Sequence, residues 1–378
     1  MSITFNDSEG HTIGIEVEVQ LIDRDTMALT PTSTKIIDGL KDYTESIKHE
    51  LMLSNLEINT KICSNIDEAE RDLTEKFNIA ITEASKYNTL LCCAGTHPFS
   101  PWKDQQITED KRYKRLLRNL QIIARRFNIF GLHVHVGING AERCIYILKR
   151  LLYYLPHLLA LSANSPFWEG YDTGLRSYRT KVFESLPIAG LPFFFKDWAD
   201  YTKLVENYLA TRTVETIRDI WWDIRPHPDF GTLEVRICDA PSTIREILAL
   251  AALIQALIKK LGDEYENGVP FKQPHSSVIR ENKWRACRYG LGEEFITPDG
   301  NRTIRAREAI EELIASVDED AKELGSREYI SHIKDILNKG EGAVKQLNEW
   351  KRQGELKAVT KEMSERLYRE VSSGMPGK

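Results

Sequence analysis

Cysteine is scarce in this sequence, and no two cysteines have the spacing of a metal-binding pair. The chain contains six cysteines in 378 residues, none of them in a C-x-x-C motif: Cys63, Cys92, Cys93, Cys144, Cys238 and Cys287. In a protein of this size the pattern predicts reduced, mostly buried thiols and a cytoplasmic location. It also argues against a structural zinc site built on paired cysteines.

An excess of one charge is also absent. The 51 Lys and Arg residues nearly balance 56 Asp and Glu residues, which gives a formal net charge of −5. No basic block marks a nucleic-acid-binding surface, so we expect no nucleic-acid partner. An anionic ligand would therefore have to be bound by a local cluster of cations.

Long hydrophobic runs and an N-terminal targeting segment are missing as well. The longest apolar run, Ile247 to Ile258, is interrupted by Gln255 and is shorter than the roughly 20 residues that cross a bilayer. The first residues have neither the basic start nor the apolar core of a signal peptide. We therefore expect no membrane partner and no secretion.

The usual phosphate-binding loops do not occur. The sequence has no G-x-x-x-x-G-K-[ST] motif and no G-x-G-x-x-G motif after a predicted strand. If a nucleoside triphosphate binds, metal ions and basic side chains must hold its phosphates. The basic candidates are Arg176, Arg179, Lys181, Arg225, Arg236, Arg280, Lys283, Arg285 and Arg288.

What the sequence does contain is four segments in which apolar and polar residues alternate, which is typical of strands with one buried face. These segments are Thr12–Ile22, Leu51–Ile62, Phe130–Ile138 and Thr232–Cys238. Their polar positions carry Glu16, Glu18, Glu57, His133, His135, Glu234 and Arg236. The pattern predicts an α+β fold with a mainly antiparallel sheet, helices on its apolar face and a ligand cleft on its polar face.

A cleft with this many carboxylates needs cations, because like charges in one site repel one another. Carboxylates with a single imidazole suit Mg²⁺ or Mn²⁺ better than structural Zn²⁺, and their number indicates two or three ions. Such ions beside arginines favour ATP as a ligand. One E-x-E motif alone would more often be a solvated strand face, and one H-x-H motif alone is as often structural as ligand-binding. The agreement of four strands therefore carries this hypothesis.

The rest of the chain predicts helices and loops. Helical spacing, with one short buried strand at Asn88–Gly95, covers the ranges Ile66–Tyr87, Lys111–Phe127 and Arg143–Leu161. The loop Asn164–Lys181 is longer than a simple connector and is a candidate lid or substrate clamp. The Pro and Gly residues of 221–231 are expected to break any regular element, and the chain after Pro241 to be almost wholly helical.

Six motifs in order carry a resemblance to a known family: IGIEVEVQLID, LEINT, FGLHVHVGI, ANSPFWEGYDTGLRSYR, RPHPDFGTLEVRICD and ENKWRACRYGL. They resemble the type 2 glutamate-cysteine ligase family, in particular its YbdK-like carboxylate-amine ligases. The resemblance implies a glutamine-synthetase-like catalytic fold, a sheet funnel that binds ATP with Mg²⁺ or Mn²⁺. We place the catalytic region at residues 1–291 and a helical extension, packed on the same domain, at 292–378.

The resemblance also implies roles for single residues. Metal ligands would be Glu16, Glu18, Glu57, His133 and Glu234. Arg236 would hold phosphate or a substrate carboxylate and His135 would face the substrate, which makes these two the catalytic candidates. The residues expected to contact substrate or ATP are Arg225, Asn164, Arg176, Arg179, Lys283 and Arg288.

The implied activity is ATP-dependent formation of an amide, of the γ-glutamyl type, from an amino-acid-like carboxylate and an amine through an acyl phosphate. A homodimer is expected from base rates and family likeness. Two alternatives stay open. A metal-dependent amidohydrolase would also use an H-x-H on a strand, but with further histidines at later strand ends. A non-catalytic nucleotide- or amino-acid-binding relative would be expected to lack a metal ligand.

Overall fold

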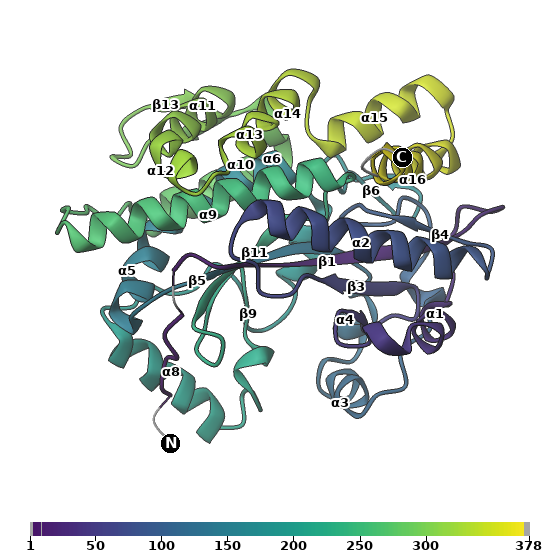
Figure 1. The fold of residues 1–378 in the computed structure, drawn as a ribbon, viewed down its shortest axis with the longest axis horizontal. Coiled ribbons are helices and arrows are strands. Elements are labelled where there is room, and N and C mark those ends of the chain that lie inside the picture. Colours follow the sequence, from purple (N-terminus) through teal and green to yellow (C-terminus); the bar gives the residue numbers. More distant parts are fainter. Residues whose placement is uncertain (1–2, 9, 374–378) are drawn as a thin grey trace.

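A seven-stranded antiparallel sheet crosses the centre of the molecule (Figure 1). The computed structural model describes residues 3–8 and 10–373. The strands run in the order β10-β11-β5-β1-β3-β2, and β4 pairs with the end of β1. Their bounds are β1 Ile13–Asp23, β2 Ile47–His49, β3 Asn55–Asn59, β4 Thr89–Cys92, β5 Gly131–Gly137, β10 Ile224–His227 and β11 Thr232–Asp239.

One face of this sheet is apolar, and helices cover it. The alternation in β1 points Ile15, Val17 and Val19 to this face, where each is at most 1% exposed. Helices α2 (Ile66–Ser85) and α9 (Ile244–Glu266) lie across it (Figure 1). Burial of each such aliphatic side chain stabilises the fold by about 1.5–3 kcal/mol, so the apolar half of the pattern fixes which face turns inward.

A further layer of helices covers α9. The C-terminal part of the chain, green to yellow in Figure 1, lies above α9 and reaches β4 through α16. Helices α5 and α6 pack against α9 and β11. The bounds are α5 Ala141–Leu151, α6 Leu155–Ser162, α10 Ser276–Tyr289, α11 Ala306–Ser316, α12 Asp318–Glu323, α13 Arg327–Ser331, α14 Ile333–Lys339, α15 Gly342–Gln353 and α16 Leu356–Ser373.

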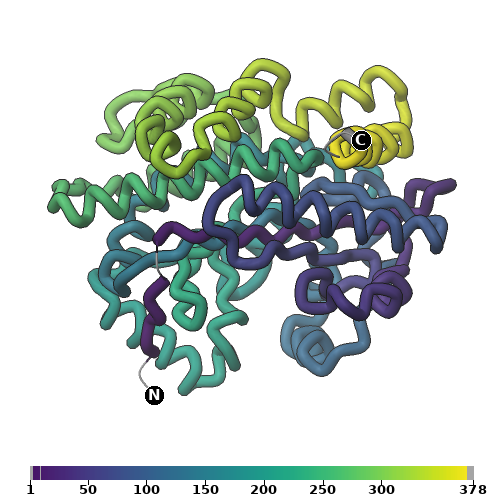
Figure 2. Tube along the Cα trace, in the orientation of Figure 1, coloured from purple at the N-terminus to yellow at the C-terminus, as the bar shows by residue number. Residues whose placement is uncertain are grey.

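The opposite, polar face of the sheet is flanked rather than covered. Helices α3 (Lys111–Leu120) and α4 (Ile122–Arg125) lie on one side below the sheet, and α8 (Trp198–Ala210) with β9 (Trp221–Trp222) lies on the other (Figure 1). The N-terminal segment runs down beside α8 (Figure 2). The remaining elements are α1 Ser33–Gly39, α7 Tyr178–Phe183, β6 Phe167–Trp168, β7 Tyr171–Asp172, β8 Ala189–Gly190, β12 Glu294–Ile296 and β13 Thr303–Arg305.

The four alternating segments all form strands, but the second one is shorter than predicted. Residues 51–54 form a turn, and β3 covers only Asn55–Asn59. The predicted helices Lys111–Phe127 and Arg143–Leu161 each split in two. The first breaks at Gln121, whose φ is 52°, and the second breaks between Leu151 and Leu155.

One further expectation was wrong. Residues 221–231 were expected to form no regular element, yet they contain β9 and β10. Pro226 is tolerated there because β10 is an edge strand, where a missing N–H costs no ladder hydrogen bond on the open side. The region after Pro241 is almost wholly helical, as predicted, apart from the short paired strands β12 and β13.

No single helix among residues 3–8 and 10–373 has both the length and the apolar composition to cross a membrane. Within these residues, α5 and α6 meet the two criteria only as a pair, which is bent by 63° at their junction.

Candidate active site

A cavity of about 910 Å³ opens on the polar face of the sheet. The strand register brings the predicted residues together at its floor. Glu16 of β1 is opposite His133 of β5, Glu18 is opposite Glu57 of β3, and His135 is opposite Glu234 of β11. All seven polar residues predicted from the strand pattern line this cavity: Glu16, Glu18, Glu57, His133, His135, Glu234 and Arg236.

Glu16, His133 and Glu234 form the tightest group of possible metal ligands among the described residues. One ligand atom from each lies within 4.8 Å of the others. His133 Nδ1 is 3.3 Å from Glu16 Oε2. Burial, helped by the charge of Arg236, lowers the pKa of His133 to about 4, so its imidazole is neutral and has a lone pair for a cation. Burial opposes ionisation of Glu16, but hydrogen bonds with His133 and His135 outweigh it and hold the Glu16 pKa well below its ordinary value.

A second group of carboxylates lies beside the first. Burial raises the pKa of Glu18 to about 7, against the charge of Arg179. Burial also raises the pKa of Glu57, and the negative charge of Glu16 adds to the shift. Glu50, which the strand pattern did not single out, joins this group. Burial raises its pKa, and the charges of Glu57 and Glu18 raise it further.

Two arginines hold Glu234 ionised. Arg225 donates from Nε to Glu234 Oε2 at 2.9 Å, and Arg236 donates to Glu234 Oε1. Burial opposes ionisation, but the charges of Arg225 and Arg236 outweigh it and hold the Glu234 pKa far below its ordinary value. Burial alone would lower the pKa of His135, yet the charge of Glu234 raises it overall. His135 Nε2 lies 3.4 Å from Glu16 and 3.7 Å from Glu234, so the ring sits between the two carboxylates.

The donor set fits hard divalent cations. It offers five carboxylates and one neutral imidazole on a buried floor, which is an oxygen-rich set suited to Mg²⁺ or Mn²⁺. Burial is the largest cause of the raised pKa values of Glu18, Glu50 and Glu57, and the negative charge of a neighbouring carboxylate adds to each shift. Divalent cations would remove that repulsion.

The other predicted ligand-binding residues divide into two classes. Arg225 and Arg179 line the cavity. The Arg179 guanidinium, however, donates to the carbonyl groups of Ile237 and Arg236 at 3.2 Å each, which ties it to β11.

Asn164, Arg176, Lys283 and Arg288 lie away from this cavity. Asn164 is 1% exposed and donates from Nδ2 to the Ala240 carbonyl at 2.8 Å. Lys283 is ion-paired with Asp223 and Glu184 at 2.5 and 2.6 Å. Arg176 lies 3.7 Å from Glu341, and Arg288 donates to the Gly174 carbonyl. Their binding roles stay predictions, and these contacts give each side chain a place in the fold.

The loop Asn164–Lys181, predicted as a lid or substrate clamp, is anchored inside the protein. Asp239 accepts hydrogen bonds from the Asn164 N–H at 2.8 Å, from Ser165 Oγ at 2.6 Å and from Ser177 Oγ at 2.8 Å. Ser165 and Ser177 are fully buried. These bonds fix both ends of the loop, and of its residues Arg179 lines the cavity. Its role as a lid or clamp stays a prediction.

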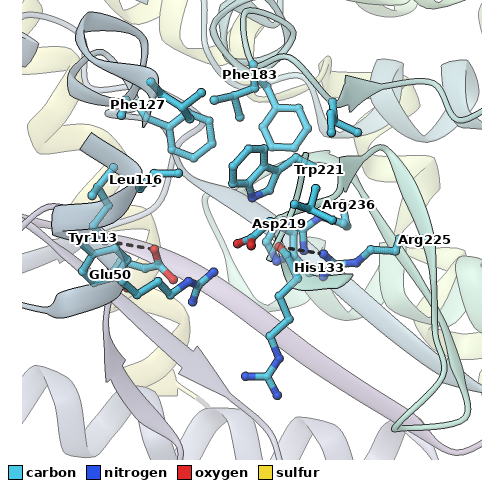
Figure 3. Close-up of a pocket in the computed structure, with 18 of the residues that line it drawn as sticks. Glu50, Tyr113, Leu116, Phe127, His133, Phe183, Asp219, Trp221, Arg225 and Arg236 are labelled. Atoms are coloured by element: carbon cyan, nitrogen blue, oxygen red, sulfur yellow. Dashed lines mark hydrogen bonds between the residues drawn. The ribbon is translucent and has the colours of Figure 1, made fainter. Parts of the chain in front are cut away.

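The cavity also has an apolar wall that the sequence did not reveal. Phe127, Phe183 and Trp221 lie on one side of it, and Glu50, Arg225 and Arg236 lie on the other (Figure 3). Leu116 of α3 extends this wall. These residues come from four separate segments, so no local pattern could have grouped them.

Other lining residues lacked a sequence signal as well. His227 and Phe230 stack with ring centroids 3.9 Å apart at the β10–β11 hairpin. Arg115, in the predicted helix Lys111–Phe127, reaches the cavity together with Tyr113. Glu50 precedes β3 by a turn, outside the alternating stretch.

Comparison with known proteins identifies similar chains. The sequence matches glutamate-cysteine ligase family 2 (GCS2) over residues 12–369. It is 43% identical over 366 residues to a candidate glutamate–cysteine ligase 2 of Gloeobacter violaceus, covering 96% of this chain and 98% of that protein. A candidate glutamate–cysteine ligase 2 of Solibacter usitatus is 42% identical over 356 residues, covering 94% and 92% of the two chains.

The fold also matches a solved structure. The glutamate–cysteine ligase of Francisella tularensis, crystallised in complex with AMP, superposes with a TM-score of 0.72 at 14% sequence identity, covering 98% of this chain and 90% of that one. The predicted α+β fold of glutamine-synthetase type, with its antiparallel sheet, is confirmed.

Proposed function

The chain belongs to glutamate-cysteine ligase family 2, and from this premise we propose that it is an ATP-dependent ligase that joins a carboxylate to an amine. The observation that carries the proposal is the buried floor of five carboxylates and a neutral imidazole, with Arg225 and Arg236 beside it. The AMP complex of the Francisella tularensis ligase supports nucleotide binding in this fold.

We propose two positions for divalent cations on the floor, the first of which is the close cluster of ligand atoms described above. Glu16, His133 and Glu234 would hold one ion, and Glu18, Glu50 and Glu57 would hold one or two more. Bound Mg²⁺ or Mn²⁺ would neutralise the charge that develops on a transferring phosphoryl group.

The proposed reaction has two steps. A carboxylate oxygen of the substrate attacks the γ-phosphorus of ATP, the bond to the bridging oxygen breaks, and ADP leaves. The amine then attacks the acyl carbon, loses a proton, and displaces inorganic phosphate to leave an amide. Arg236 is the cation placed to hold phosphoryl or carboxylate oxygens, because its guanidinium borders both the cavity and Glu234.

The protein supplies no covalent nucleophile in this mechanism. All six cysteines are free and buried. Burial raises the pKa of Cys92, Cys238 and Cys287 to about 12 in each case, so these side chains stay thiols at neutral pH. Substrate positioning and electrostatic stabilisation of the transition state must therefore provide the rate acceleration.

We propose glutamate and cysteine as the first substrate pair to test, because the similar proteins bear the name of that reaction. The proposed product is a γ-glutamyl amide. A homodimer and a cytoplasmic location stay predictions.

The test is ADP release by the purified protein with ATP and Mg²⁺ or Mn²⁺, over a panel of carboxylates and amines that includes glutamate with cysteine. ADP release that needs both substrates, with equal amounts of amide product, would support the ligase. Glu16→Ala should abolish release. Lack of release with any pair, or normal release by Glu16→Ala, would contradict the proposal.

A further inference from the structure

The mouth of the cavity is bordered by two separate parts of the chain. Helix α3 contributes Arg115 and Leu116, and the turn at residues 213–219, between α8 and β9, contributes Glu215 and Asp219. Leu116 and Asp219 lie on different sides of the cavity (Figure 3). We call residues 213–219 the mouth turn.

Arg115 connects these two sides. Its Nη1 lies 2.5 Å from Glu215 Oε2, and its Nη2 lies 3.6 Å from Asp219 Oδ2. Asp219 Oδ2 also accepts the backbone N–H groups of Glu215 and Thr216, at 3.1 Å each. The carboxylate that shapes the mouth turn is thus the one that faces Arg115.

The inner side of the mouth turn is tied to the floor of the cavity. Arg225 Nη1 donates to the carbonyl groups of Ile217, Arg218 and Ile220, at 3.4, 3.2 and 2.9 Å. The same guanidinium binds Glu234 through Nε and Nη2. The position of the mouth turn is therefore set from inside by Arg225, which Glu234 holds in place, and from outside by Arg115.

We propose that the mouth turn is a lid that Arg115 holds closed over the reacting centre, which keeps water from the acyl phosphate. This rests on the proposed function. Attack of water on the acyl phosphate would return the free carboxylate and release phosphate, so ATP would be consumed without an amide. A closed lid suppresses this side reaction. Arg115 is then a positioning residue, because it acts through the mouth turn.

The ion pairs of Arg115 suit a lid that must open. The side chains of Arg115, Glu215 and Asp219 are 29%, 52% and 15% exposed, and ion pairs at such positions contribute little to the stability of a fold. Their loss should loosen the outer part of the mouth turn, which Arg225 does not hold, without unfolding the chain. Lys114, the preceding residue, offers a matched control, since it pairs with Glu109 at 2.7 Å outside the cavity.

The experiment compares Arg115→Gln, Arg115→Lys and Lys114→Gln with the wild type, using ATP, Mg²⁺, glutamate and cysteine. The first readout is the ratio of amide to ADP, together with ADP release when cysteine is omitted. Arg115→Gln should raise amine-independent ADP release relative to amide by about two- to fivefold, the range of one exposed ion pair. Arg115→Lys should restore much of the coupling, and Lys114→Gln should match the wild type.

The second readout is amide hydrogen exchange in residues 213–219, which needs no turnover. Exchange should be faster in Arg115→Gln and unchanged in Lys114→Gln. Unchanged exchange in Arg115→Gln would overturn the clamp, and faster exchange with an unchanged amide-to-ADP ratio would overturn its role against water. A wild type with no ADP release would refute the ligase function instead, and exchange would still test the clamp.

Discussion

Arg236 is the floor residue whose removal should separate metal binding from chemistry. It donates to Glu234, but Glu234 keeps a second partner in Arg225, so the carboxylate stays ionised without Arg236. Burial opposes protonation of Arg236, yet the charge of Glu234 raises its pKa, so the guanidinium is a fixed cation on the cavity floor.

We predict that Arg236→Ala lowers kcat by about 100-fold, the effect typical of removing one preorganised group that stabilises charge in a transition state. Mn²⁺ binding should persist, because the acidic ligands remain. The measurement is kcat for ADP release alongside an Mn²⁺ titration. An unchanged kcat would remove Arg236 from the site.

His157 shows how a buried histidine outside the site affects stability. It is 2% exposed, its Nδ1 has no hydrogen-bond partner, and it packs against Phe295 with ring centroids 4.9 Å apart. Burial lowers its pKa to about 4. The unfolded chain takes up a proton below about pH 6.5, while the folded chain resists it down to about pH 4. Stability is therefore lost as the pH falls through this window.

For His157→Phe we predict that the loss of unfolding free energy between pH 7 and pH 5 shrinks by about 2 kcal/mol. The loss should not vanish, since burial also lowers the pKa of His97 to about 4. Urea unfolding of variant and wild type at pH 7 and pH 5 measures this loss of unfolding free energy. An equal loss in variant and wild type would mean that His157 does not titrate as its burial requires.

The seven floor residues predicted from the strands could be found because alternation is local: one strand decides which side chains share a face. Glu50, His227 and Arg115 could not, because each reaches the cavity from a turn, a hairpin or a helix whose own pattern says nothing about the sheet. Asn164 and Lys283 lie outside the cavity, and their binding roles stay predictions. Their type suits ligand binding, but buried partners across the chain engage them.

At the scale of elements, the β10–β11 hairpin depends on one glycine. Gly231 has a φ of 63°, and a Cβ there would lie 1.9 Å from the carbonyl oxygen of Asn6. The N-terminal segment is hydrogen-bonded to this hairpin, with the Asn6 N–H donating to the Pro228 carbonyl at 2.9 Å. The left-handed backbone of Gly231 disfavours any other residue, and the contact with Asn6 leaves no room for a side chain.

Gly231→Ala should destabilise the protein more than Gly354→Ala. Gly354 has a similar φ of 75° and no atom within 4 Å of its missing Cβ, so it isolates the backbone cost of about 1–2 kcal/mol. Gly231→Ala should cost at least about 1 kcal/mol more, from the clash with Asn6. Equilibrium unfolding compares the two variants. Equal losses of unfolding free energy in the two variants would show that the N-terminal segment moves aside without a measurable cost.

The long strands were predictable because alternation over seven or more residues is rarely produced by anything except a half-buried strand. The helix breaks were not, because apolar spacing continues across Gln121 and across residues 152–154. The strand that contains Pro226 was missed because a strand tolerates proline only at a sheet edge, and only the assembled sheet defines which strand is at the edge. Strands of two residues, such as β6 and β9, are too short to carry a period.

At the scale of the whole molecule, the C-terminal helices complete the core. Val359, Met363 and Leu367 of α16 are at most 3% exposed, and Ser364 donates to the Leu91 carbonyl of β4 at 2.8 Å. Gln346 of α15 donates to Asn164 Oδ1 at 2.8 Å. These contacts link the end of the chain to the strand that pairs with β1.

A chain that ends at Gly340 should therefore fail to fold cooperatively, because it exposes the apolar surface that α15 and α16 cover. Circular dichroism during heating would show a broad, weak transition in place of a sharp one. Leu367→Ala in the full chain should cost about 2–5 kcal/mol. A sharp transition in the shortened chain would make residues 341–373 dispensable for the fold.

The central claim is that the acidic floor binds divalent cations for ATP chemistry, and Mn²⁺ titration followed by electron paramagnetic resonance tests it most directly. With a non-hydrolysable ATP analogue present, the wild type should bind two or three Mn²⁺ ions per chain. Glu16→Gln should lose at least one of them, and Glu109→Gln, at an exposed position just before α3, should lose none. Absence of Mn²⁺ binding, or equal binding by Glu16→Gln and the wild type, would contradict the account.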